Sequence, residues 1–154
     1  MNKVLLEICC GSAEDVIEAA KGGADRVELN SNLFQGGLTP SIGALTIAKK
    51  YTNIPIMTMV RPRAGGFCYT DTEFEVACED AEQLLAHGAD GLVVGFLHED
   101  GTVDRERTKE LVRIASGKPC VFHRALDVVP DWKRFAPHVI SFKAGQVIVI
   151  LQEE

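Results

Sequence analysis

The sequence predicts an α/β fold, in which the strands of a parallel sheet alternate with helices along the chain. Five strand-like segments begin near residues 4, 26, 54, 91 and 119, and a segment of helix length separates each pair. Residues 18–29 and 83–94 also repeat one pattern, a helix end followed by Gly-Ala-Asp and a strand start. This spacing and this repeat are typical of consecutive βα units.

The composition is that of a soluble globular domain. The chain has 154 residues, of which 46% are hydrophobic, and a net charge of −6. An acidic chain lacks the basic face that nucleic acid requires, and no apolar run approaches the ~20 residues that cross a bilayer. Five cysteines without a Cys-x-x-Cys pair favour a reducing compartment. We therefore expect a cytoplasmic protein that binds neither nucleic acid nor membranes.

The first predicted unit begins with the apolar segment 4–10, which is typical of a buried strand. Ser12 follows as a candidate helix N-cap, with Asp15 three residues later, and Gly22 would end this helix. Residues 26–30 predict the second strand. The chain would thus return to the sheet beside its first strand.

The second predicted helix begins at Thr39 and Pro40, because threonine caps a helix well and proline suits the first helical position. It would run to about Tyr51. Residues 54–60 are enriched in the residues that pleated sheets accept, and they predict the third strand.

A third helix is predicted from a capping box that Thr70 and Glu73 would form, and it would stop at Gly88. The apolar segment 91–96 predicts the fourth strand. The sequence therefore keeps the alternation of strand and helix through this part of the chain.

Asp104 caps a fourth predicted helix, and residues 119–127 supply the fifth strand. After Asp127 the alternation stops, and residues 139–151 predict a short hairpin or two loose strands. We therefore divide the chain into residues 1–127, with about five βα units, and an atypical tail of residues 128–154.

Charged and polar residues recur inside strand segments that otherwise look buried. Functional groups of α/β folds gather at the carboxyl ends of parallel strands, so we expect these residues to converge there. The expected group comprises Arg61 and four candidate acid–base residues, Glu7, Glu28, His123 and Asp127. Alternation along the fifth strand would place His123 and Asp127 on one face. A buried charge is costly unless it is paired, so the alternative is an ion-pair network that only orders the interior.

An arginine- and glycine-rich loop follows the third predicted strand. Forked guanidinium donors together with free backbone N–H groups favour the binding of a phosphate or a carboxylate. The predicted anion-binding residues are Arg61, Arg63, Gly65 and Gly66 of this loop, and Arg124 of the fifth strand. The alternative is a solvated turn whose arginines form surface ion pairs.

Cys9 is the candidate metal ligand. Thiolates and thioethers favour Cu(I), and Met57 and Met59 lie on the third predicted strand. Cys9 and Cys10 are adjacent in one strand and point to opposite faces, so they cannot chelate an ion together. The alternative is a cysteine that packs as a small apolar side chain.

Seven collinear motifs resemble the copper homeostasis protein CutC family. They are LLEICCGS, GGADRVELN, QGGLTPSIG, MVRPRAGGFCYTD, DGLVVG, EDGTVD and FHRALD. They run to Asp127, and we expect the tail of residues 128–154 to lie outside the family. The resemblance implies a cytoplasmic TIM (β/α)8 barrel with a copper-associated role, and Cys9 matches a family cysteine proposed as a Cu(I) ligand. Asn30 stands where a second cysteine is common in the family. Residues 61–67, Arg-Pro-Arg-Ala-Gly-Gly-Phe, also differ from the usual family motif Arg-Pro-Arg-Gly-Gly-Asp-Phe.

The resemblance leaves three functions open. The first is copper homeostasis with binding of copper(I). The second is a barrel enzyme that acts on a small anionic substrate, bearing a phosphate or carboxylate, by acid–base chemistry. The third is an inactive fragment, because the usual barrel has about 250 residues and we therefore expect a truncated or frameshifted member.

Five parallel strands do not close a barrel, so the edges of the sheet need a partner. We expect that the tail pairs with an edge, that two chains associate, or that the protein aggregates. An open five-stranded sheet of the flavodoxin type also fits the length, but the motifs favour part of a barrel.

Overall fold

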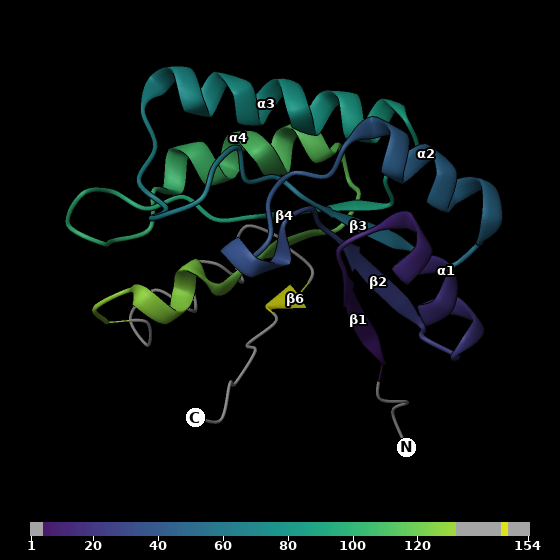
Figure 1. Ribbon diagram of the computed structural model, residues 1–154. Coiled ribbons are helices and arrows are strands. Elements are labelled where there is room, and N and C mark those ends of the chain that lie inside the picture. The colour runs from purple at the N-terminus through teal and green to yellow at the C-terminus, as the bar shows by residue number, and fades with distance from the viewer. Residues whose placement is uncertain (1–4, 132–145, 148–154) are drawn as a thin grey trace.

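The computed structural model describes residues 5–131 and 146–147. Its strands form one parallel six-stranded sheet in chain order, and the four α-helices cover one face of it (Figure 1). The strands are β1 Glu7–Cys10, β2 Arg26–Leu29, β3 Ile56–Met59, β4 Gly91–Val94, β5 Cys120–Phe122 and β6 Gln146–Val147. This arrangement confirms the prediction of a partial (β/α) barrel.

The helices begin largely where local capping chemistry predicts. The α-helices are α1 Ala13–Lys21, α2 Ile42–Tyr51, α3 Asp71–Ala86 and α4 Arg105–Ala115. The Ser12 hydroxyl accepts a hydrogen bond from the backbone N–H of Asp15, and Thr70 and Glu73 form the predicted capping box. The Asp104 carboxylate accepts from the N–H of Arg107 at 3.0 Å. Each cap satisfies backbone donors that a first helical turn leaves without partners.

The start of α2 differs from the prediction. Ser41 is the N-cap, and its hydroxyl accepts from the N–H of Ala44 at 3.1 Å. Thr39 is instead tied to the end of β3, because its hydroxyl accepts from the N–H of Arg61 at 3.0 Å. The expected cap at Thr39 was therefore wrong, since a partner distant in sequence takes its side chain.

The fifth strand is shorter than predicted. It ends at Phe122, and a 3-10 helix, η2 Arg124–Val128, follows. The His123 ring nitrogen Nδ1 accepts from the N–H of Ala125 at 3.1 Å, which turns the chain out of the strand. The expected alternation over residues 123–127 was therefore wrong, and Asp127 is exposed in η2.

The two faces of the sheet bury different side chains. Toward the helices, strand residues such as Val27 and Leu92 belong to the main apolar core. On the opposite, inner face, a smaller buried cluster forms from Met57, Met59, Val93 and Val121. The inner face becomes polar toward β1 and β2, because Cys9 and Glu28 are register partners there and Glu28 is in turn the partner of Met57.

The tail contributes β6, which pairs in parallel with β5. The expectation that the tail pairs with an edge of the sheet is therefore confirmed for Gln146 and Val147. The remainder of the hairpin predicted for 139–151 lies outside the described residues. Within the described part of the chain, we find no helix with the length and apolar character needed to span a bilayer.

Candidate functional site

Four buried polar side chains lie at the carboxyl ends of neighbouring strands, and we call them the mouth cluster: Glu28, Asn30, Arg61 and His123. Glu28 is in β2 and Asn30 follows that strand, whereas Arg61 and His123 come shortly after β3 and β5. Parallel strands end at one edge of the sheet, so these side chains share one end of the fold. Glu28, Arg61 and His123, three of the five residues expected to converge, therefore lie at this end of the sheet.

Glu28 is a buried carboxyl group without a paired cation among the described residues. Its oxygen Oε1 accepts a hydrogen bond from Asn30 Nδ2 at 3.0 Å, and the Cys9 thiol lies 3.7 Å from the same oxygen. Burial raises the pKa of Glu28, and the hydrogen bond from Asn30 opposes that rise only in part. The carboxyl group therefore holds its proton more strongly than a solvated glutamate does.

Glu7 is held outside the mouth cluster. Its carboxylate pairs with the guanidinium of Arg26, its register partner at the start of β2. Both side chains are mostly buried, and they lie at the amino ends of their strands. For Glu7 the arrangement matches the alternative in which a buried charge is paired and orders the interior.

Cys9 faces Glu28 on the inner side of the sheet, and part of its side chain is exposed to solvent. Desolvation by the surrounding protein, together with the carboxylates of Glu28 and Glu7, raises the pKa of Cys9 to about 12. A thiol with such a pKa is protonated at neutral pH, whereas a metal ligand must be a thiolate. A metal ion would therefore have to displace the thiol proton before it could bind Cys9.

The other candidate soft ligands do not join Cys9. Glu28 stands between Cys9 and Met57 in the strand register, so the thioether is two strands away. Residues 5–131 and 146–147 contain no group of three His, Cys, Asp or Glu side chains that could hold a metal ion. The described residues therefore do not fit a resident copper ion.

Arg61 connects the two loops that border the mouth cluster. Its Nη1 donates to the carbonyl oxygens of Gln35 at 2.8 Å and Gly37 at 2.9 Å, and its Nη2 donates to that of Gly65 at 2.7 Å. The guanidinium lies 5.1 Å from the centre of the Phe67 ring. Most of its donors are therefore used within the protein, and Nε alone is buried without a partner in the described part.

Arg63 and the loop glycines serve the loop itself. Arg63 Nε donates to the Glu73 carboxylate at 2.6 Å, and its Nη atoms donate to the carbonyl oxygens of Gly66 at 2.8 Å and Cys68 at 2.7 Å. The hydrogen bond between Arg63 and Glu73 raises the pKa of Arg63 and lowers that of Glu73. Gly65 and Gly66 thus present carbonyl oxygens to arginines, which is the opposite polarity to an anion cradle.

Arg124 is exposed, yet its guanidinium approaches that of Arg61. A Cβ atom built on Gly36 would lie 3.2 Å from Nη1 of Arg124 and 3.3 Å from Nη1 of Arg61. Of the five predicted anion-binding residues, the structure therefore brings Arg61 and Arg124 to the same glycine. Arg63 is engaged by Glu73 instead.

His123 is a buried, neutral imidazole. Its Nδ1 accepts from a backbone N–H, so the proton resides on Nε2, which has no partner in the described part of the chain. Burial lowers the pKa of His123 to about 3, and the nearby positive charge of Arg61 adds to this effect. At neutral pH the ring is a hydrogen-bond donor through Nε2 and carries no charge.

Two residues that position His123 were missed in the sequence. A Cβ atom on Gly95 would overlap the imidazole, so only glycine permits this packing. The Phe67 ring lies 5.0 Å from the imidazole, centre to centre. A glycine just after the fourth predicted strand was the available signal, since glycine there often marks close approach of another group.

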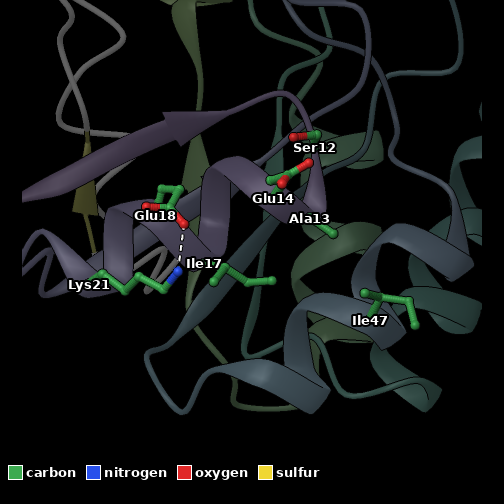
Figure 2. A pocket seen from close by; sticks show the side chains of 7 residues that line it. All are labelled: Ser12, Ala13, Glu14, Ile17, Glu18, Lys21 and Ile47. Atoms are coloured by element: carbon green, nitrogen blue, oxygen red, sulfur yellow. Dashed lines mark hydrogen bonds and ion pairs between the residues drawn. The ribbon is translucent and has the colours of Figure 1, made fainter.

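A separate hollow lies on the helical layer between α1 and α2 (Figure 2). It is lined by Ser12, Ala13, Glu14, Ile17, Glu18, Lys21 and Ile47. Glu18 and Lys21 form an exposed ion pair of 2.7 Å across one turn of α1 (Figure 2). None of these residues belongs to the mouth cluster, and an exposed pair of this kind contributes little energy.

Solved structures support the fold. The chain superposes on a crystal structure of a CutC protein from Streptococcus agalactiae with a TM-score of 0.84 and 35% identity, over 90% of this chain and 69% of that one. It also resembles phosphoenolpyruvate phosphomutase from Streptomyces platensis, with a TM-score of 0.64 at 8% identity. The second likeness concerns the barrel fold alone.

Sequence relatives identify the family. A CutC protein from Treponema denticola is 50% identical over 153 residues, which are 99% of this chain and 62% of the relative. The copper homeostasis protein cutC homolog of Homo sapiens is 47% identical over 130 residues, 84% of this chain and 48% of the relative. The chain thus spans 62% of the length of the first relative and 48% of the length of the second.

The match to the CutC family covers residues 4–152. It extends past Asp127 into the tail that we expected to lie outside the family, although the division of the chain at Asp127 itself stays a prediction. The match includes nearly the whole sequence, together with the parallel sheet and the mouth cluster described above. The chain therefore belongs to the CutC family.

Proposed function

We propose that this chain takes part in copper homeostasis, the role that the names of its relatives state. The observation that carries the proposal is 47% identity over 130 residues to the human copper homeostasis protein cutC homolog. Because the chain spans 48% of that relative, the role of the whole protein is a proposal here.

We infer that Cys9 is the contact for copper, and that copper is a weakly held cargo. Cu(I) prefers soft thiolate ligands, and Cys9 has an accessible sulfur on the inner face of the sheet. Its pKa of about 12 means that binding must displace a firmly held proton. Weak and pH-dependent binding is the consequence.

Cu(I) titration against a competing chromogenic chelator tests this role. We expect the affinity of the wild-type protein to rise about tenfold per pH unit between pH 7 and pH 9, because one thiol proton is released. Cys9→Ser should abolish this binding. Cys68→Ser is the matched control, since Cys68 is also an exposed free cysteine but lies in the loop before α3. Equal affinities of wild type and Cys9→Ser would remove Cys9 from the proposal.

A second candidate is a barrel enzyme that acts on a small anionic substrate. The mouth cluster favours it, because a buried carboxyl group, an imidazole and a guanidinium share the end of the sheet where barrel enzymes place their sites. Glu28 would carry the proton, since burial raises its pKa toward the range where general acids and bases work.

Turnover of a panel of phosphorylated and carboxylated metabolites tests the second candidate. Glu28→Gln keeps an oxygen for the hydrogen bond from Asn30 but cannot ionise, so we expect it to lose turnover while it remains folded. Glu14→Gln, on the exposed start of α1, is the control that should keep full activity. Turnover that survives in Glu28→Gln would exclude Glu28 as the proton carrier.

A further inference from the structure

Three buried polar atoms of the mouth cluster have no hydrogen-bond partner in the described part of the chain. They are Arg61 Nε, His123 Nε2 and Asn30 Oδ1, and the Tyr69 hydroxyl is a fourth such atom, outside the cluster. The three side chains are at most 5% exposed. Buried polar atoms are almost always paired in native proteins, so three unpaired atoms in one cluster indicate that a further group completes the set.

Contacts with two residues bring these three side chains together. Phe67 packs against both the Arg61 guanidinium, at 5.1 Å, and the His123 imidazole, at 5.0 Å. Gly37 accepts a hydrogen bond from Arg61 through its carbonyl, and it lies so close to Asn30 that a Cβ atom would overlap the Asn30 side chain. Arg61 is therefore joined to His123 through Phe67 and to Asn30 through Gly37, so the three side chains are neighbours.

The polarity of each atom follows from its other contacts. Asn30 Nδ2 donates to the backbone carbonyl and to Oε1 of Glu28, which leaves Oδ1 as an acceptor. His123 Nδ1 accepts a backbone N–H, which leaves Nε2–H as a donor. Arg61 Nε–H is a donor beside a positive charge. A partner for this set must offer two acceptors and one donor, and a metal cation cannot provide them.

We propose that the mouth cluster binds a small 2-hydroxycarboxylate. Its carboxylate oxygens accept from Arg61 Nε and His123 Nε2, and its hydroxyl group donates to Asn30 Oδ1. The proposal names the ligand class of the second candidate function, but binding itself requires no turnover. A fixed cation and a neutral donor suit a carboxylate monoanion.

The loop between β2 and α2 lies against two of these side chains, Asn30 and Arg61. Residues 31–38 are closed by a bridge between Ser31 and Leu38, and the carbonyl oxygens of Gln35 and Gly37 hold the loop onto Arg61. Gly37 has φ +82°, a conformation that glycine adopts readily, and Phe34 at the tip of the loop is fully exposed. The proposal therefore includes a movement of this loop on binding, because Gly37 lies against both Asn30 and Arg61.

Binding of glycolate, measured by calorimetry and by NMR of ¹⁵N-labelled histidine, tests the proposal. We expect glycolate to bind the wild-type protein, to move the Nε2 and Hε2 signals of His123, and to leave those of His98 in place. Acetate lacks the hydroxyl group and should bind at least about fivefold more weakly. His123→Phe, which removes Nε2–H, should lower the affinity for glycolate at least about tenfold, whereas His98→Phe should not.

The possible failures are distinguishable. Glycolate that produces neither heat nor a shift of the His123 signals in the wild-type protein overturns the site, and this result needs no variant to fold. Equal binding of acetate and glycolate overturns the role of Asn30, and tighter binding of inorganic phosphate overturns the ligand class. Glycolate binding with no turnover of any metabolite would refute the second candidate function and leave the ligand site standing.

Discussion

Burial moves the pKa values of two members of the mouth cluster in opposite directions. It lowers the pKa of His123 to about 3 and raises that of Glu28, because each group is less stable in its charged form away from water. At neutral pH the imidazole therefore carries no charge. The two groups also make opposite contributions to the pH dependence of stability.

The pKa of His123 predicts a loss of stability in acid. The unfolded imidazole titrates near 6.5 and the folded one near 3, so the unfolded state binds more protons between these values. The contribution of His123 is present above pH 6.5 and is lost as the pH falls. From pH 7 to pH 5 we expect the free energy of unfolding to fall by about 2 kcal/mol more in wild type than in His123→Phe. Urea unfolding measures this difference, and a folded-state His123 that titrates near 6.5 by NMR would contradict it.

The raised pKa of Glu28 predicts the opposite trend, a loss of stability as the pH rises. Its pKa is raised in the folded state, so its contribution to stability is present below the unfolded value and is lost as the pH rises through the folded one. Glu28→Gln cannot ionise, and we expect its melting temperature relative to wild type to rise between pH 4.5 and pH 8.

Glu73→Gln is the matched control for Glu28→Gln. The pKa of Glu73 is lowered by its hydrogen bonds from Arg63 and Thr70, so this variant should lose melting temperature relative to wild type over the same pH range. Two variants that shift in the same direction would mean that the environment of one carboxylate is misassigned. Scanning calorimetry at the two pH values supplies the comparison.

The ends of the strands, rather than their middles, place the site. β3 leads into the loop that Arg61 and Arg63 organise, β4 is followed by Gly95, and β5 ends at the residue before His123. The sheet brings β4 and β5 together in parallel, so Gly95 can lie directly beneath the imidazole. The position of His123 therefore depends on the absence of a side chain in the neighbouring segment.

Gly95→Ala tests this packing. The new methyl group overlaps the His123 ring, and we expect a cost of about 1–3 kcal/mol in the free energy of unfolding, which is typical of overpacking. The imidazole Nδ1 should also lose the hydrogen bond that it accepts from the N–H of Ala125, which its ¹⁵N chemical shifts would report. Gly66→Ala is the control, because no atom lies within 4 Å of the added Cβ and the effect should stay within about 0.5 kcal/mol.

At the scale of the whole molecule, the sheet follows chain order and leaves β1 at one edge. In the described part of the chain β1 pairs with β2 alone, and the large side chains of Leu5, Leu6 and Ile8 are exposed at this edge. An unpaired strand edge with apolar side chains is a template for pairing with another chain. The sequence-based expectation that two chains associate remains a prediction.

Self-association through β1 is measurable by size-exclusion chromatography with light scattering. We expect the wild-type protein to form dimers or larger species as its concentration rises. Ile8→Lys should shift it toward the monomer, because a charge on an edge strand opposes pairing. Val76→Lys, on the exposed side of α3, should leave the association unchanged. A monomeric wild type at every concentration would contradict the prediction.

Local chemistry made most of the elements predictable. Ser12, Thr70 and Asp104 cap helices through side-chain contacts within three residues, so the sequence alone contains both partners of each hydrogen bond. Where the two partners are far apart in sequence, prediction failed. Thr39 is the example, because its hydroxyl bonds to Arg61 across 22 positions.

The sequence by itself determined the alternation of strands and helices, the family, and the presence of Glu28, Arg61 and His123 at the ends of strands. Only the tertiary structure decided which of their atoms are free. It paired Glu7 with Arg26, turned Asp127 outward in η2, and used the donors of Arg63 on Glu73. The physical reason is that periodicity fixes which face a residue occupies, whereas strand register and loop packing determine which partner satisfies each buried polar atom.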